Sequence, residues 1–127
     1  LAFTTPYDLA IQIAGFCVFF VGALTYDMTL IVAGKYLRPS TSGILGDHKL
    51  VRSGPFGVVR HPLYVSYFLI TVGLAGVLHI GWILIPSLCI AIGIYSTAKA
   101  EEEVLVEQFG DEYIKYRQEV GMFFPKV

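Results

Sequence analysis

The residue types that could do chemistry are gathered in three short stretches of the chain. They are HKLV at His48–Val51, RHPLY at Arg60–Tyr64 and EEE at Glu101–Glu103. Arginine and histidine can hold a carboxylate, whereas glutamates can pair with an ammonium or accept hydrogen bonds from sugar hydroxyls. The rings of Tyr64 and Phe56 could enclose a flat base or lie beside a positively charged sulfur. These stretches predict a site for a small ligand that carries several kinds of polar group.

Charge and hydropathy place this site at the edge of a membrane. Hydrophobic residues make up 55% of the 127 residues, above the level of about 45–50% in soluble domains. Residues 61–98 carry no Asp, Glu, Lys or Arg, and all nine cations lie in 35–60 or from Lys99 onward. A net charge of −1 gives no indication of nucleic-acid binding. Cys17 and Cys89 lie in apolar runs and form no metal-binding pattern, so we expect no metal.

The apolar runs predict an all-α integral membrane protein with about three transmembrane helices. Leu9–Tyr26 is a charge-free first span, and about 20 such residues cross a bilayer. His61–His79 and Ile80–Ala98 are joined by the turn-like HIG, so they predict an antiparallel hairpin. We expect Gly73, Gly76 and Gly93 to let helices approach closely. The expected order within one domain (1–127) is a first span (7–34), a cytoplasmic loop (35–60), a helical hairpin (61–98), and a cytoplasmic tail with short amphipathic helices (99–127).

The hairpin returns both of its ends to the side of the basic loop, which the positive-inside bias makes cytoplasmic. Arg60–Tyr64 and Glu101–Glu103 therefore stand at the same end of adjacent helices, with Arg60 and His61 expected at the water edge. S-adenosylmethionine, with its carboxylate, ammonium, ribose, adenine and sulfonium, would use every group present. Spacing alone does not separate this cofactor site from an ordinary solvated membrane edge, which would have similar charges.

Two longer stretches resemble a known enzyme family. HKLVRSGPFGVVRHPLY and EEEVLVEQFGDEYIKYRQEVGMFFP, separated by the charge-free hairpin, look like the C-terminal half of the isoprenylcysteine carboxyl methyltransferase family. They also resemble the related phospholipid N-methyltransferases. The resemblance covers about residues 47–126, and RHPxY together with a paired-Glu helix and FGxEYxxY is a specific combination. It implies a membrane enzyme that transfers a methyl group from S-adenosylmethionine to a lipid-like acceptor, most directly the carboxylate of a prenylated cysteine.

The resemblance also implies roles for individual residues. Arg60 would orient the acceptor or the cofactor carboxylate, and Tyr64 would line the reacting centre. Phe56 stands where many family members have tyrosine, which keeps an aromatic wall and removes a hydroxyl. The positions expected to bind the cofactor are His48, Lys49, Leu50, Val51, Phe56, His61, Pro62, Leu63, Tyr64, Glu101 and Glu102.

The acceptor is less well defined than the cofactor. Some family members have a substrate-binding arginine about one turn before the paired glutamates, where this chain has Thr97, with Lys99 nearby. A phospholipid amine or a thiol are alternative acceptors. Other classes are a sterol-reductase-like protein that binds NADPH and a non-catalytic membrane subunit.

The setting is expected to be a membrane, with the site facing the cytoplasm. That membrane would be the plasma membrane of a prokaryote or the endoplasmic reticulum of a eukaryote. The chain lacks an initiating Met and is shorter than family members with five or more spans, as truncation at the N-terminus would produce. Membrane lipid would surround the helices, and a second copy or additional helices would complete a substrate tunnel.

Overall fold

The structure is a computed structural model that describes residues 6–34 and 50–126. Its elements are α1 (Pro6–Ala33), the 3-10 turn η1 (Gly54–Gly57), α2 (Pro62–Leu78), the 3-10 turn η2 (Gly81–Ile83), α3 (Leu84–Phe109) and α4 (Asp111–Glu119). The described residues contain no strand beyond one isolated parallel bridge, between Val59 and Gly121. The all-α prediction is therefore confirmed for this part of the chain.

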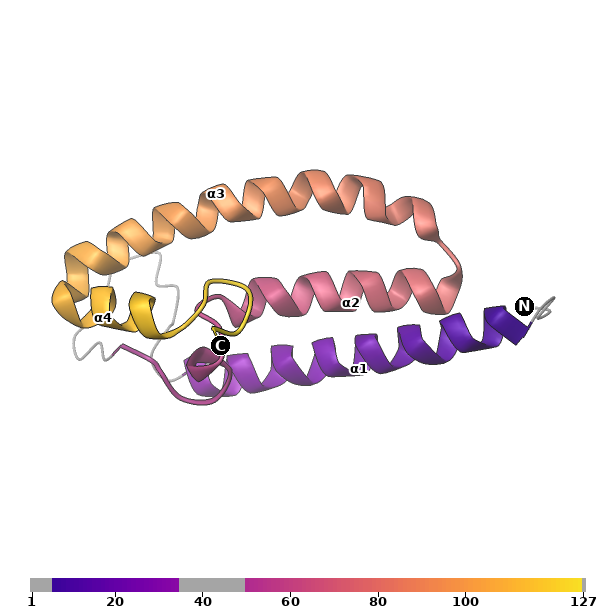
Figure 1. The fold of residues 1–127 in the computed structure, drawn as a ribbon, viewed down its shortest axis with the longest axis horizontal. Helices are drawn as coiled ribbons and strands as arrows, with labels where there is room; N and C mark the ends of the chain where they lie inside the picture. Colours follow the sequence, from indigo (N-terminus) through magenta and orange to yellow (C-terminus); the bar gives the residue numbers. More distant parts are fainter. Residues whose placement is uncertain (1–5, 35–49, 127) are drawn as a thin grey trace.

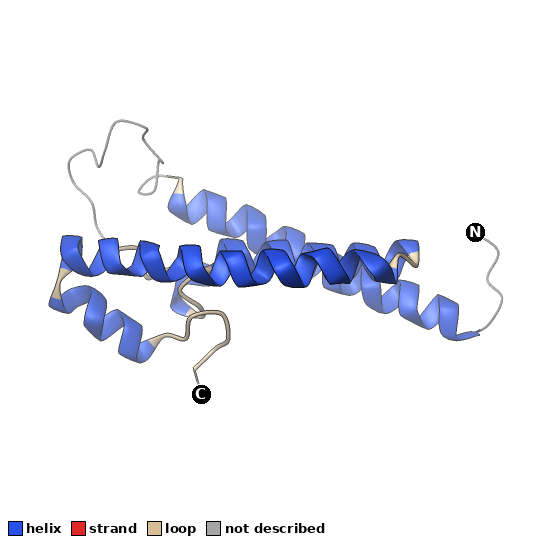
Figure 2. Ribbon diagram, turned by 90° about the horizontal axis from the view of Figure 1, so that it is seen from above, coloured by secondary structure: helices blue, strands red, loops and turns tan. Residues whose placement is uncertain are grey.

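Three long helices run side by side and alternate in direction (Figure 1). The end of α1, the start of α2 and the end of α3 all lie at one end of the bundle, where α4 folds back beneath α3. The view from above places α3 in front of the α1–α2 pair (Figure 2). This is the hairpin that the HIG turn predicts, and His79 makes the turn by adopting a left-handed backbone conformation with φ 54°.

Glycines set the spacing between α1 and α2. A Cβ added at Gly73 would lie 2.4 Å from the backbone nitrogen of Phe19, and one at Gly76 would lie 3.0 Å from the Cα of Gly15. The prediction of close approach is confirmed at these two positions. It is wrong at Gly93, where an added Cβ meets nothing within 4 Å, because α3 arches away from its neighbours in this region (Figure 1).

The apolar helices have the exposure expected of membrane spans. Tyr7–Ala33 and Gly81–Phe109 are long and apolar enough to cross a bilayer, and only 11% and 6% of their most apolar windows are buried. The core helix of a soluble protein would be mostly buried, so these two helices are not of that kind. α2 has 17 residues, slightly fewer than the roughly 20 that cross a bilayer upright, and it lies between the other two.

The tail contains one helix followed by a non-helical segment. α3 continues through its charged C-terminal part to Phe109, and Gly110 ends it with a φ of 59° that suits glycine. Asp111 is the first residue of α4, and Gly110 is the residue at its N-cap. α4 buries Tyr113 and Tyr116, which pack with Val120 against partly buried apolar neighbours. This small cluster is the core of the polar end of the protein.

Candidate functional site

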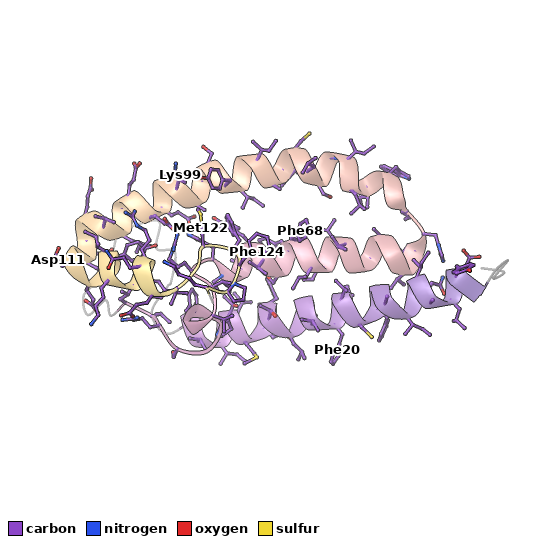
Figure 3. All side chains as sticks on the ribbon, viewed as in Figure 1. Phe20, Phe68, Lys99, Asp111, Met122 and Phe124 are labelled. Carbon is purple, nitrogen blue, oxygen red and sulfur yellow. The ribbon has the colours of Figure 1, made fainter. Side chains whose placement is uncertain are left out.

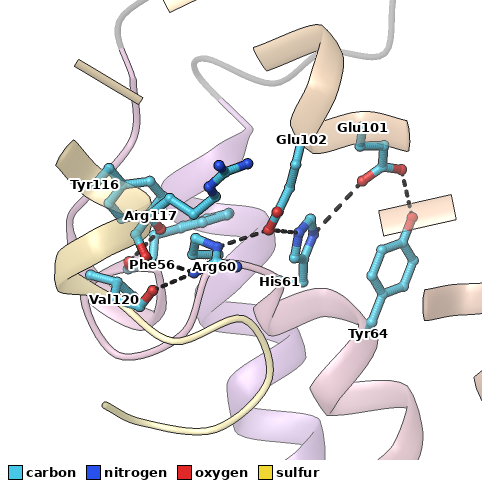
Figure 4. A network of polar contacts seen from close by, with 9 residues as sticks. All are labelled: Phe56, Arg60, His61, Tyr64, Glu101, Glu102, Tyr116, Arg117 and Val120. Atoms are coloured by element: carbon cyan, nitrogen blue, oxygen red, sulfur yellow. Dashed lines mark hydrogen bonds and ion pairs between the residues drawn. The ribbon is translucent and has the colours of Figure 1, made fainter. Parts of the chain in front are cut away.

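The start of α2 and the polar half of α3 meet in a network of charged side chains (Figure 4). Oε1 of Glu102 accepts a hydrogen bond from Nε of Arg60 at 2.8 Å and lies 3.0 Å from Nε2 of His61. A carboxylate can only accept, so His61 carries its proton on Nε2. The Arg60, His61 and Glu102 side chains are exposed by only 10%, 7% and 8%. The network is therefore buried, and the expectation that Arg60 and His61 stand at the water edge is wrong.

The two paired glutamates have different surroundings. Glu102 points inward, whereas the Glu101 side chain is 48% exposed. The hydroxyl of Tyr64 donates to Oε1 of Glu101 at 2.6 Å, and Oε2 lies 3.8 Å from Nδ1 of His61. Because consecutive residues on a helix point about 100° apart, only Glu101 keeps its carboxylate open to a ligand while Glu102 holds the scaffold.

Arg60 fastens the segment Val120–Pro125, which we name the C-terminal strap. Its Nη1 donates to the carbonyl of Val120 at 2.6 Å and to the carbonyl of Arg117 at 3.0 Å. The backbone nitrogens of Arg60 and His61 donate to the carbonyls of Gly121 and Met122 at 2.8 and 3.2 Å. The strap is thus paired with the residues that precede α2, through both backbone and side chain.

Aromatic rings surround His61. The ring of Tyr64 lies nearly parallel to the imidazole at 5.7 Å, and the ring of Phe123 lies 5.8 Å from it. Phe123 is also 6.4 Å from the ring of Tyr95 on α3. The strap therefore connects α2 and α3 beside the charged network.

An apolar cavity adjoins this network. Its volume is about 510 Å³, and it lies between α2, α3 and the strap. Figure 3 labels Phe68 on α2 and Phe124 on the strap, and both residues line the cavity. Tyr64 belongs to both regions, because its ring lines the cavity and its hydroxyl bonds to Glu101. The lining residues are Tyr64, Val65, Tyr67, Phe68, Leu69, Thr71, Ser87, Ile90, Ala91, Ile94, Phe123, Phe124 and Pro125.

The remaining residues predicted to bind the cofactor are divided between two environments. His48 and Lys49 lie outside the described residues. Leu50 packs against the Tyr113–Tyr116 core, and Phe56 is 8% exposed. Pro62 is fully buried, whereas Val51 and Leu63 are half-buried.

Tyr116 ties this core to the segment before α2. Its hydroxyl donates to the carbonyl of Phe56 at 2.6 Å. Burial raises the pKa of Tyr116 to about 12, so the phenol remains a donor at neutral pH. Arg52 lies over the same ring at 5.2 Å and pairs with Glu119, and the hydrogen bond from Arg52 lowers the pKa of the Glu119 carboxyl. These contacts attach α4 to the segment that precedes α2.

Sequence patterns alone did not identify Phe123 and Tyr95 as site residues. The tail GMFFPKV contains two adjacent phenylalanines, and Phe124 is 83% exposed. Phe123, in contrast, faces His61. The sequence signal for this part of the site is a pair of aromatic residues before a proline, soon after a polar helix. This pair does not indicate which of the two rings faces the site.

Comparison with known proteins supports one family. The sequence profile described as the isoprenylcysteine carboxyl methyltransferase family matches residues 13–107. A protein-S-isoprenylcysteine O-methyltransferase of Tribolium castaneum is 30% identical over 114 residues, which cover 87% of this chain and 40% of that protein. One from Schizosaccharomyces pombe is 31% identical over 117 residues, covering 81% and 50%. A methanethiol S-methyltransferase of a Pseudomonas species is 41% identical over 78 residues, covering 56% and 26%.

A solved structure agrees with these sequence matches. The structure of a eukaryotic intramembrane Ras methyltransferase, an isoprenylcysteine carboxyl methyltransferase, superposes with a TM-score of 0.76 at 28% identity. The match covers 92% of this chain and 43% of the other. The chain thus spans between 40% and 50% of the length of the isoprenylcysteine methyltransferases that it matches.

The profile match includes α2 and the part of α3 that carries Glu101 and Glu102. The resemblance of the RHPLY and EEE stretches therefore extends to the helices that bring them together. Sequence, fold and solved structure agree that this integral membrane protein belongs to the isoprenylcysteine carboxyl methyltransferase family.

Proposed function

We propose that this chain carries the site that transfers a methyl group from S-adenosylmethionine to the carboxylate of a prenylated cysteine. The observation that carries the proposal is the position of Tyr64, which joins an apolar cavity of about 510 Å³ to the open carboxylate of Glu101. One residue thus touches a space suited to a lipid chain and a polar group suited to a water-soluble methyl donor. The family relationship supports the same reaction.

The chemistry of the site favours an acceptor that is already ionised. A carboxylate has a reference pKa near ~4, so it needs no general base at neutral pH, whereas a thiol must lose a proton near ~8.5. His61 directs Nε2 to Glu102, and its imidazole lies between the rings of Tyr64 and Phe123. The volume and apolar lining of the cavity also exceed what a very small thiol needs. A prenylated carboxylate therefore fits better than a small thiol or a phospholipid amine.

The described residues also fit the methyl donor. Glu101 offers a half-exposed carboxylate that can pair with an ammonium or accept hydrogen bonds from ribose. The ring of Tyr64 stands beside it and can lie against a sulfonium. When bound, S-adenosylmethionine supplies an electrophilic methyl group. His48, Lys49, Val51 and Leu63 stay predicted contacts.

The packed residues act through the scaffold. Leu50, Phe56, Arg60 and Glu102 are engaged with other parts of the chain, so we assign them to positioning the site. The residues that face the ligands would bind both substrates in line and exclude water. Such positioning can contribute about 7–11 kcal/mol in favourable cases.

The site opens at the end of the bundle that carries the cations of 50–60 and 99–126. By the positive-inside bias this end faces the cytoplasm, in the plasma membrane of a prokaryote or the endoplasmic reticulum of a eukaryote. The acceptor would enter the cavity from the bilayer, and the methyl donor would enter from water. A second copy or further helices would close the exposed faces of α3.

The test is methyl transfer from S-adenosylmethionine carrying a radiolabelled methyl group, with the protein in lipid nanodiscs. The acceptors are N-acetyl-S-farnesylcysteine, methanethiol and a phospholipid extract. We expect transfer to the first alone, with a product that alkali hydrolyses as a methyl ester. Transfer to methanethiol or lipid without transfer to the prenylated carboxylate would overturn the assignment of the acceptor.

The role of Glu101 is tested separately by calorimetric titration with S-adenosylmethionine. Glu101→Gln should weaken binding tenfold or more, about 1.4 kcal/mol. Glu107→Gln is the matched control, because Glu107 is exposed on the same helix. Equal affinity for both variants and the wild type would show that Glu101 does not hold the donor.

A further inference from the structure

We propose that His61 is a positioning residue that gives up a proton when the methyl donor binds. Before binding, a doubly protonated imidazole lies between the carboxylates of Glu101 and Glu102. When a cationic donor pairs with Glu101, Nδ1 of His61 releases its proton to water. This inference rests on the proposed function, in which S-adenosylmethionine is held at Glu101. Three observations carry it: the two acids that face the ring, the aromatic rings beside it, and the exposed side of Glu101.

The two ring nitrogens of His61 face two different carboxylates (Figure 4). Nε2 lies 3.0 Å from Oε1 of Glu102, and Nδ1 lies 3.8 Å from Oε2 of Glu101. A neutral imidazole with its proton on Nε2 would direct the lone pair of Nδ1 at a carboxylate oxygen, so two acceptors would face each other. A second proton on Nδ1 removes this conflict and makes the ring a cation between two acids.

The charged groups around the ring favour this cation before the donor binds. Arg60 donates from Nε to Glu102 and so balances that acid. Among the described residues, His61 is the one group within ion-pairing distance of Glu101 that can carry a positive charge. From α4, Tyr113 interacts electrostatically with Glu102 and Arg60, and burial raises its pKa, so its phenol stays uncharged at neutral pH. The charge of Glu101 is therefore compensated only when the imidazole is charged.

The aromatic rings on either side of the imidazole support the same charge state. A ring face attracts a cation that lies within about 6 Å of its centroid. The nearly parallel ring of Tyr64 lies 5.7 Å from that of His61, and the ring of Phe123 from the strap lies at 5.8 Å. Burial by itself disfavours a charged imidazole. The two carboxylates and the ring of Tyr64 oppose this cost.

Glu101 can exchange His61 for a ligand. Its Oε1 accepts a hydrogen bond from the hydroxyl of Tyr64 at 2.6 Å, whereas its Oε2 lies 3.8 Å from Nδ1 of His61, beyond hydrogen-bond distance. The longer contact is the one that a cationic donor replaces. Because the Glu101 side chain is 48% exposed, the donor can reach it from water and the proton can leave by the same side. By linkage, the proton on His61 must weaken donor binding as much as the donor weakens proton binding.

The first experiment counts the protons released during binding. S-adenosylmethionine is titrated into the protein in nanodiscs by calorimetry, in two buffers that differ in ionisation enthalpy. We expect net proton release, up to about one proton per donor. Affinity should then fall by up to about tenfold per pH unit as the pH is lowered through the range in which histidines titrate. The donor's amino group stays charged below about pH 7, because α-amino groups titrate near ~7.7–8.0.

Two histidine variants make this measurement specific. His61→Gln keeps a donor for Glu102 but cannot take a second proton, so it should bind without proton release and with an affinity that changes little with pH. His79→Gln is the matched control, since His79 is exposed in the turn after α2, at the other end of the bundle. It should behave as the wild type. Proton release that persists in folded His61→Gln would overturn the inference.

A second experiment needs no donor and does not require His61→Gln to fold. The background His48→Gln with His79→Gln leaves His61 as the only histidine, because the chain has three. The ring of His61 is followed by carbon NMR as the pH changes. Adding Glu101→Gln should move its titration midpoint to lower pH by roughly one unit, because an opposite charge nearby favours the charged form. Adding Glu103→Gln, at an exposed position on the same helix, should leave the midpoint unchanged.

The outcomes separate this inference from the proposed reaction. Equal midpoints in the Glu101 and Glu103 variants, or donor binding by the wild type without proton release, would overturn the role of His61 even if methyl transfer occurs. Proton-linked binding without transfer to the prenylated carboxylate would count against the proposed reaction alone. Absence of donor binding would overturn both.

Discussion

Nε of Arg60 lies 2.8 Å from Oε1 of Glu102, and the two side chains are 10% and 8% exposed. This buried ion pair links the start of α2 to α3, and Arg60 extends the link to the C-terminal strap (Figure 4). Removing one partner of such a pair leaves a buried charge without compensation, which costs far more than losing a surface pair. The pair is therefore expected to matter first for the integrity of the site.

Glu102→Gln should lower the free energy of unfolding by about 3 kcal/mol, because the charge of Arg60 loses its counterion in a buried position. Unfolding is followed by circular dichroism in detergent. Glu103→Gln is the control, because Glu103 is the next residue on the same helix and its side chain is exposed. Equal stability of the two variants would contradict the buried-pair assignment.

Arg60→Lys should loosen the strap while keeping the charge. Lysine has no fork of donors with which to hold Glu102 and the carbonyls of Arg117 and Val120 together. Hydrogen exchange of the backbone amides at positions 60 and 61, which bond to strap carbonyls, should become faster. Arg52→Lys, at an exposed ion pair, should leave this exchange unchanged. Exchange at the wild-type rate in the Arg60→Lys variant would refute the fastening role.

Tyr116→Phe should destabilise the protein by about 1 kcal/mol at neutral pH, because the Phe56 carbonyl loses its buried donor. The native pKa of Tyr116 is raised from 10.0 to about 12, so its native state disfavours the phenolate. The stability linked to this shift is complete below pH 10 and is lost as the pH rises toward 12. The free energy of unfolding, measured across this pH range, should therefore fall less steeply with pH in the Phe variant than in the wild type. Parallel curves for the two proteins would refute the linkage.

Gly73→Val should separate α1 from α2 and cost about 2 kcal/mol, since a Cβ at this position would lie 2.4 Å from the Phe19 backbone. Gly93→Val introduces the same side chain into a helix where nothing lies within 4 Å. It controls for the intrinsic effect of valine. Thermal unfolding in detergent compares the two, and similar midpoints would argue against tight α1–α2 packing.

Cysteines introduced in place of Glu107 and Gly81 should react from opposite sides of the membrane, because these residues lie near opposite ends of α3. The background carries Cys17→Ser and Cys89→Ser, which removes both exposed native thiols. A membrane-impermeant maleimide is applied to sealed vesicles of known orientation. Labelling of both positions from one side would exclude the hairpin as a transmembrane structure.

Much of the fold follows from the sequence because charge and hydropathy alone define it. The charge-free stretch with a break at HIG determines where α2 turns into α3, and the run from Leu9 predicts α1. The close approach of helices is harder to predict, because a glycine permits contact without requiring it. Gly73 and Gly76 meet α1, whereas Gly93, on a similarly apolar helix, meets nothing.

The site was only partly predictable, for a comparable reason. The sequence brings RHPLY and EEE to one end of the bundle, but it does not give the direction of each side chain around its helix. Glu101 and Glu102 are equivalent in the sequence, yet one is open and the other is buried. In the sequence, Arg60 resembles a surface cation. Its hydrogen-bond acceptors include the backbone carbonyls of Arg117 and Val120, and a pattern of residue types does not predict contacts to backbone carbonyls.

The pairing of Val59 with Gly121 has a consequence for how the chain is made. About 60 residues separate these partners, so the ribosome completes both helices of the hairpin before the strap exists. During that interval the guanidinium of Arg60 has no strap carbonyls to bond, and the cavity has no end wall. Synthesis of the strap residues 120–125 thus follows synthesis of the membrane hairpin, so the bonds between Arg60 and the strap form late in the assembly of this end of the bundle.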